Sequence, residues 1–111
     1  MAVFTPKRLS GPAYLTTSAT PVYTVGAGLT GVVKQIVFNN TSAGAATVTA
    51  HIVPNAGSAT TSNQVISQLS ISAYSQIIWS ADIPLSAGES VQLLSNTTSA
   101  ISATVTGIEI S

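Results

Sequence analysis

Three residues of this sequence have the types that a serine hydrolase uses: Ser90, His51 and Asp82. Such triads are assembled in space, so their separation along the chain does not exclude one. The stretch Gly88-Glu89-Ser90 begins like a Gly-x-Ser-x-Gly elbow, but Gln92 stands where the second glycine belongs. An apolar strand pattern also follows, where the elbow requires a helix. The pattern therefore favours a turn that leads into a strand, with Ser90 in that strand and His51 a solvent-facing strand residue.

Other catalytic and cofactor chemistries lack the residues that they need. Glycoside hydrolysis requires two carboxylates across a cleft, and the acidic residues, Asp82, Glu89 and Glu109, fall at turns or on the last expected strand. One histidine and no cysteine exclude an ordinary zinc site. Calcium could use Asp82, Glu89 and loop carbonyls, but no acidic loop has the ligand spacing. We therefore expect no enzymatic activity, no catalytic residue, no metal and no cofactor.

Charged residues are scarce in this chain. They make up 5% of it and the formal net charge is zero, whereas an ordinary soluble domain has about 25%. Three basic residues cannot neutralise the roughly six to ten phosphates of a nucleic-acid site. An uncharged surface does little to repel copies of itself. Two interpretations follow: a component of a permanent assembly, including a homo-oligomer, or a small extracellular or thermally robust β domain kept soluble by hydroxyl groups.

The length and hydropathy of the chain limit its organisation. Its 111 residues suit one compact domain. It has no run of about 18 apolar residues that could span a membrane, so we expect no membrane partner. The scarcity of basic residues likewise predicts no nucleic-acid partner. The start, MAVFTPKRLSGP, lacks the apolar region of a signal peptide. This predicts synthesis in a cytoplasm.

The elements that position these residues are expected to be short strands. Val, Ile and Thr are abundant, and Gly, Pro, Ser and Asn interrupt the sequence about every ten residues. The expected strands are 13–19, 21–25, 32–40, 46–54, 64–72, 73–81, 90–95 and 101–110, with a mobile polar loop over 55–63. The sequence thus predicts an all-β, single-domain antiparallel β-sandwich, either jelly-roll-like or immunoglobulin-like.

Alternation along the expected strands assigns side chains to the core. In 101–110, Gly107 is expected to mark a bulge that turns Ile108 and Ile110 inward. Trp79 is favoured as a core residue, although Trp79, Tyr74, Tyr23 and Tyr14 could instead form a sugar-binding platform. In 64–72, three apolar residues are expected to share one face, namely Val65, Leu69 and Ile71.

The first twelve residues differ from the rest and are expected to form an extended N-terminal arm, with the β-sandwich domain spanning 13–111. Pro6 and Pro12 oppose regular strand pairing. The arm carries Phe4, Lys7 and Arg8, which could anchor in an apolar pocket and pair with acidic groups of a neighbouring protein. These three residues are the candidate contact residues.

Three stretches resemble the small virion proteins of tailed bacteriophages. These are VYTVGAGLTGVVKQIVFNN (22–40), ADIPLSAGESVQL (81–93) and TVTGIEI (104–110). Each is ordinary β-hairpin sequence, and their order carries the resemblance, which covers about the last 90 residues. With its length and arm, the chain most resembles the capsid decoration (staple or cement) proteins of epsilon-fifteen-like podoviruses.

This resemblance implies a non-enzymatic virion protein with a jelly-roll-like sandwich. It would sit on the outside of the capsid and stabilise it by bridging neighbouring major capsid proteins, its expected partners. Virion location on the outer capsid surface and synthesis in the host cytoplasm are implied as well. The alternative is a receptor- or carbohydrate-binding β-sandwich module associated with a tail or fibre.

Overall fold

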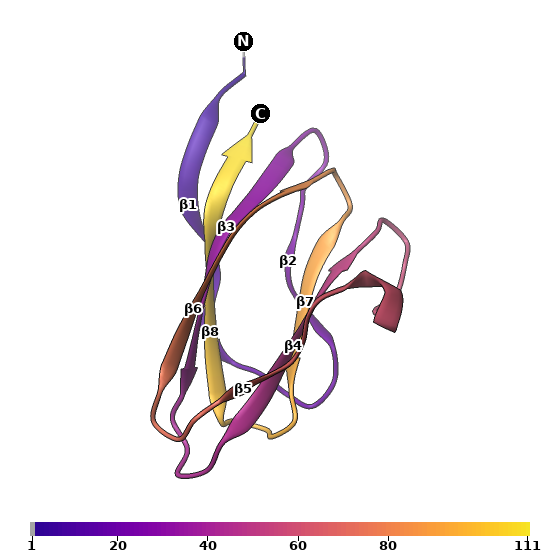
Figure 1. The fold of residues 1–111 in the computed structure, drawn as a ribbon. Helices are drawn as coiled ribbons and strands as arrows, with labels where there is room; N and C mark the ends of the chain where they lie inside the picture. The colour runs from indigo at the N-terminus through magenta and orange to yellow at the C-terminus, as the bar shows by residue number, and fades with distance from the viewer. Residues whose placement is uncertain (1) are drawn as a thin grey trace.

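The computed structural model describes residues 2–111, and nearly every element in it is a β-strand. Figure 1 views the two sheets edge-on, facing each other. The elements are β1 (Phe4–Tyr14), β2 (Thr20–Thr24), β3 (Thr30–Asn40), β4 (Ala46–Val53), the single 3₁₀ turn η1 (Thr61–Asn63), β5 (Gln64–Ile71), β6 (Gln76–Leu85), β7 (Ser90–Ser95) and β8 (Ile101–Ile110). Among residues 2–111 there is no helix long and apolar enough to cross a membrane.

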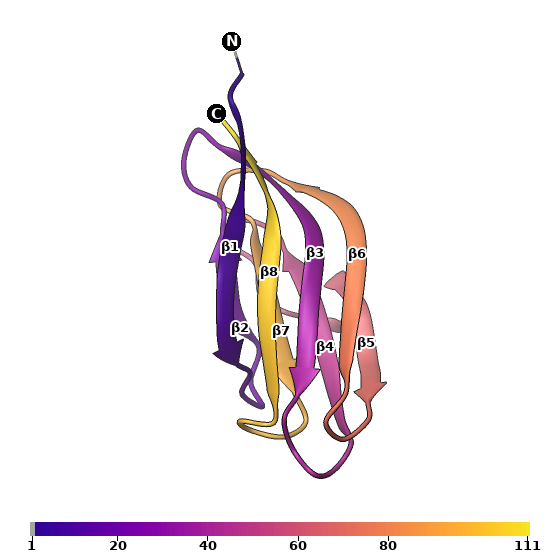
Figure 2. The same ribbon diagram turned by 90° about the vertical axis from the view of Figure 1, so that its left-hand side faces the viewer.

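The strand order identifies the sandwich as a jelly roll. One sheet has the order β1-β8-β3-β6 and lies toward the viewer in Figure 2; the other has the order β2-β7-β4-β5. The strands form four antiparallel pairs, β1–β8, β2–β7, β3–β6 and β4–β5. This is the pairing of one long hairpin that is folded over on itself, which is the jelly-roll pattern. The predicted antiparallel β-sandwich is confirmed, and its jelly-roll form is selected over the immunoglobulin-like one.

The core lies between the two sheets and is almost entirely aliphatic. Phe38 and Ile36 from β3 belong to one buried cluster with Leu93 and Val91 from β7, and all four are at most 1% exposed. Both β3 and β7 are central strands, with a neighbouring strand on each side. Burial of these apolar side chains is the dominant favourable contribution to folding.

The N-terminal segment belongs to the first sheet. β1 continues past residue 12 as one strand with two register shifts, and it pairs with β8 from Phe4↔Ile110 to Tyr14↔Ser102. The expectation that Pro6 opposes regular pairing is therefore wrong. Val3 exchanges two backbone hydrogen bonds with Ser111, so alternation directs the backbone nitrogen of Pro6 away from β8. An edge strand tolerates proline at such a position.

Even so, the first half of β1 projects beyond the body of the sandwich. Residues 2–8 are all exposed, and Figures 1 and 2 show this end of β1 rising with the end of β8 past the second sheet. We call the pair 4–8 and 106–110 the N-terminal ribbon. Met1 of the predicted arm lies outside the described residues.

Two expectations about side-chain faces are wrong, because β8 lacks the bulge that was expected at Gly107 and β5 has one that was not expected. Gly107 stays in phase with Val105, and the register shifts lie in the neighbours β1 and β3, so Ile108 and Ile110 lie on the outer face. In β5, Gln68 has a φ of 50° beside a register shift, and Val65 is consequently turned outward with 41% of its surface exposed.

The turn between β6 and β7 spans residues 86–89 and does not contain a catalytic elbow. β6 continues through Pro84 to Leu85, and Gly88 takes a φ of 85°, which favours glycine. Glu89 caps the turn by accepting a hydrogen bond of 2.7 Å from the backbone N–H of Ser86. The prediction of a strand-to-strand turn is confirmed.

Candidate interaction surface

The possible hydrolase residues do not form a triad. His51 and Ser90 share the outer face of the second sheet, but Nδ1 of His51 lies 2.8 Å from Oδ1 of Asn63, and Oγ of Ser90 accepts from Gln92 at 3.4 Å. Asp82 lies on β6 in the other sheet and forms an exposed ion pair with Lys34. Within residues 2–111, the side chain bonded to the imidazole is thus the amide of Asn63 and not a carboxylate.

His51 is nevertheless not the solvent-facing residue that its strand pattern predicted. It is 5% exposed, because the segment between β4 and β5 covers it. Asn63 organises this segment: its Oδ1 also accepts from the backbone N–H of Thr60, and its Nδ2 donates to the carbonyl of Ser58. The polar segment expected as a mobile loop is thus tied to the sheet by one amide side chain.

Metal chemistry has no structural support in the described part of the chain. Among residues 2–111, no three of the side chains of His, Asp or Glu gather in one place. The acidic residues Asp82, Glu89 and Glu109 lie on β6, in the β6–β7 turn and on β8.

The three candidate contact residues lie along the N-terminal ribbon and have different surroundings. The ring of Phe4 is 64% exposed and stands opposite Ile110. Arg8 is exposed and takes part in neither ion pair of the described residues. Nζ of Lys7 donates a hydrogen bond of 2.9 Å to Oε1 of Glu109, so its charge is already engaged within the molecule.

Glu109 links the ribbon to the opposite sheet. Its Oε2 accepts a hydrogen bond of 2.7 Å from the hydroxyl of Tyr23 on β2, while Oε1 binds Lys7. The hydrogen bonds from Lys7 and Tyr23 hold the pKa of Glu109 below its ordinary value. Burial, followed by the hydrogen bond to Glu109 and its negative charge, raises the pKa of Tyr23. Gly31 leaves room for the phenol, since a Cβ there would stand 2.8 Å from its oxygen.

The outer face of the first sheet is apolar at the ribbon end. Opposite residues in a ladder share a face, and the register joins Phe4 to Ile110, and Pro6 through Ile108 and Val32 to Pro84. None of them belongs to the buried core or packs against it. We call this set the outer apolar surface: Phe4, Pro6, Val32, Pro84, Ile108 and Ile110.

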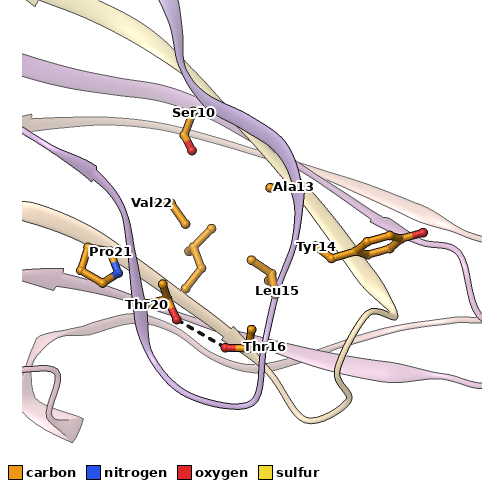
Figure 3. Close-up of a pocket in the computed structure, with 9 residues that line it drawn as sticks. Ser10, Ala13, Tyr14, Leu15, Thr16, Thr20, Pro21 and Val22 are labelled. Atoms are coloured by element: carbon orange, nitrogen blue, oxygen red, sulfur yellow. Dashed lines mark hydrogen bonds between the residues drawn. The ribbon is translucent and has the colours of Figure 1, made fainter.

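A cavity of about 250 Å³ opens between β1 and β2. Figure 3 shows Leu15 and Val22 directed toward this space, while the ring of Tyr14 points away from it. Thr16 and Thr20 close one end with a hydrogen bond of 3.3 Å between their hydroxyls. The lining carries no charged side chain, so the cavity suits an apolar group and not an ionic ligand.

The four aromatic residues considered as a sugar-binding platform do not lie together on one exposed surface. Trp79 is partly buried and packs against the core, as favoured from the sequence. Tyr74 is 73% exposed with a φ of 56°. Tyr14, on β1, donates to or accepts from Thr41 at 3.1 Å. Tyr23 is directed into the sandwich toward Glu109.

Comparisons with known proteins recover the fold. No family model and no curated protein matches this chain. A chain in the structure of infectious bursal disease virus Gx strain is 8% identical with a TM-score of 0.55; the alignment covers 99% of this chain and 33% of that chain. The tobacco streak virus coat protein dimer is 10% identical with a TM-score of 0.44, covering 99% and 84%. This chain therefore spans about a third of the Gx strain chain, with which it shares the sandwich fold.

Sequence reasoning missed the two features that organise this surface. The outer apolar surface combines residues from four paired strands, and the prediction misplaced Ile108 and Ile110 by assuming a bulge at Gly107, whereas β8 alternates without a break. The contact of Glu109 with Tyr23 joins residues 86 apart. Its only sequence signal is an acidic residue, Glu109, between two isoleucines at the end of a strand.

Proposed function

We propose that this protein is a non-enzymatic structural component of a virion, which decorates the outside of a tailed-phage capsid and bridges neighbouring major capsid proteins. The outer apolar surface carries the proposal. It continues onto a projecting ribbon whose residues 2–8 are exposed, so it can reach across a boundary between two neighbouring molecules. Exposed apolar patches rimmed by polar residues are typical of protein interaction sites.

The scarcity of charged residues supports a protein partner. With 5% charged residues, contacts repeated many times over a shell would require little desolvation of charge. The viral structure with the shared fold is consistent with a virion location, as is the resemblance of segments 22–40, 81–93 and 104–110 to phage virion proteins.

The contact residues can be ranked from their surroundings. Phe4 offers an aromatic anchor that is 64% exposed, and Arg8 offers a cation that pairs with no acidic residue in the described chain. Lys7 is engaged by Glu109, so its main part is to hold the ribbon in position. In this proposal Phe4 and Arg8 touch the capsid protein, and Lys7 is a positioning residue.

Binding to heads that lack the protein tests the proposal. The variants Phe4→Ala and Arg8→Gln should each weaken co-sedimentation with such heads at least tenfold. Tyr14→Ala is the matched control, because Tyr14 is an aromatic residue on the same strand with 53% exposure, at the other end of β1. Equal binding by Phe4→Ala and the wild type would contradict the assigned contact.

Heating distinguishes bridging from mere attachment. Heads that carry the protein should release their DNA at a higher temperature than heads without it. An unchanged release temperature would contradict the bridging role. Imaging of whole particles, with density expected on the outer shell, tests the proposed location.

A further inference from the structure

Three of the four sheet edges carry devices that oppose pairing with another strand. β1 has Pro6 and Pro12 with two cationic residues between them, β2 is five residues long and contains Pro21, and β5 is broken by the bulge at Gln68. Proline, charge, bulges and short length all discourage edge-to-edge association. These edges are therefore protected.

The fourth edge is protected along only half of its length. In β6, Ala81 and Asp82 together face the single residue Lys34 of β3, and Pro84 follows. The first half, Gln76–Ser80, has the sequence QIIWS, with no proline, charge or bulge. We call this five-residue stretch the open edge.

The backbone groups of the open edge alternate in direction. The carbonyl of Ser75 accepts a hydrogen bond of 2.8 Å from the N–H of Asn40, which fixes the pattern of the β3–β6 ladder. Alternation then directs the N–H and C=O of Ile77 and Trp79 toward β3. The N–H and C=O groups of Gln76, Ile78 and Ser80 point the other way, away from β3 and toward the open side of the sheet. Within residues 2–111, β6 pairs with no strand other than β3.

We propose that the open edge binds the open edge of a second copy of this chain, antiparallel and across a two-fold axis at Ile78. In this register Ile78 pairs with the partner's Ile78, and Gln76 pairs with the partner's Ser80. All six outward backbone groups of each copy then find partners, giving six hydrogen bonds. The two first sheets become one continuous sheet, which a two-fold operation closes as a dimer.

The side chains fit the same register. On the inner face, Ile77 stands opposite the partner's Trp79, an aromatic and β-branched pair of the kind that stabilises neighbouring strands. Both are only partly buried in one copy, so pairing covers them further. On the outer face, Ile78, 53% exposed, meets its own counterpart between two polar pairs. The open edge has no charge, so no like charges within it oppose each other.

A second copy is favoured over a foreign strand because the five-residue stretch is complementary to itself in hydrogen bonding and in side chains. The inference is independent of the proposed virion function, since it concerns the purified protein. A contact confined to one strand edge is small, so we expect weak association, with a Kd of about 1 μM to 1 mM.

Sedimentation of the purified full chain over that concentration range tests the proposal. Wild type should form a dimer and nothing larger, and Ile78→Lys should raise the dimer Kd at least tenfold by opposing two ammonium groups. Val65→Lys is the matched control, because Val65 is an exposed aliphatic residue on edge strand β5; its Kd should match wild type. A wild type that stays monomeric, or equal effects of the two lysines, would overturn the proposal.

Amide hydrogen exchange of the wild type provides a test that does not depend on a variant folding. On raising the concentration, the amides of Gln76, Ile78 and Ser80 should gain protection, whereas those of Ile77 and Trp79 should be protected throughout. Dimerisation without this alternating gain would overturn the register. Gain only on addition of another protein would overturn the choice of partner.

Discussion

The hydroxyl of Tyr23 donates a hydrogen bond of 2.7 Å to Oε2 of Glu109 and so joins the two sheets at the ribbon end of the sandwich. Lys7 binds the other carboxylate oxygen at 2.9 Å, which leaves both oxygens of Glu109 occupied. One carboxylate therefore ties the edge strand β1 to β8 and to the opposite sheet. Its protonation state should be felt in the stability of the whole domain.

Glu109 should make stability decrease in acid. Its folded-state pKa is lowered by Lys7 and Tyr23, so its contribution is complete above the unfolded value, about 4.3, and is lost as the pH falls through the folded value. Urea unfolding measured at pH 7 and at pH 3 should show that the unfolding free energy falls less between these two pH values for Glu109→Gln than for wild type. Tyr23→Phe should show an intermediate loss, since one of the two hydrogen bonds remains. Identical pH dependence in all three proteins would contradict the role of Glu109.

Tyr23 should ionise late in an alkaline titration. Its pKa is raised by burial and by Glu109, so its neutral form stabilises the fold below the unfolded value, about 10, and this contribution is lost as the pH rises through the folded value. Ultraviolet absorbance should show a tyrosinate component above pH 10 that is missing in Tyr23→Phe. At pH 7 that variant should lose about 1–3 kcal/mol of unfolding free energy. A late component that persists in the variant would assign it to another tyrosine.

The side chain of Asn63 should hold the segment between β4 and β5 against the sheet. Asn63→Ala removes its bonds to His51, Thr60 and Ser58 and should lower the unfolding free energy by about 1–3 kcal/mol. Limited proteolysis within 54–63 should become faster. Ser62→Ala, which removes one exposed hydroxyl contact to Thr60, serves as the control and should be cut at the wild-type rate.

The phase of β8 can be checked by comparing two isoleucines. Ile36→Ala empties a site that is 1% exposed in the core and should lower the unfolding free energy by about 2–5 kcal/mol. Ile108→Ala trims the outer face and should lower it by less than about 1 kcal/mol. Chemical denaturation of both variants measures the difference. Equal losses would place Ile108 in the core.

Local patterns predicted the strands well where packing and alternation agree. β3, β4, β7 and β8 lie close to their expected ranges, because each is a buried strand bounded by turn residues. The start of β1 was not predicted, because a proline such as Pro6 disfavours a strand unless its backbone nitrogen faces solvent. Which way that nitrogen faces depends on the register with β8. The alternating pattern around His51 likewise predicted an exposed side chain, because the pattern of one strand does not show that another segment packs over His51.

The surroundings of the three candidate contact residues were predicted only in part for the same physical reason. Phe4 and Arg8 lie exposed, and their role as contact residues stays a prediction. The engagement of Lys7 by Glu109 depends on a pairing between residues 102 apart. The outer position of Ile108 follows from the unbroken alternation of β8, and the prediction for it is wrong because it assumes a bulge at Gly107. Properties set by long-range register do not appear in a window of neighbouring residues.

The double hydrogen bond between Val3 and Ser111 also has a practical consequence. The two ends of the described chain emerge side by side, so a short glycine-rich linker could join them without disturbing the sheet. New ends opened at Gly57 would give a circular permutant with the same strand order. Peptides fused to these two ends would both be displayed from one pole of an elongated molecule, 49 Å along its longest axis, and the rest of its surface would stay unmodified.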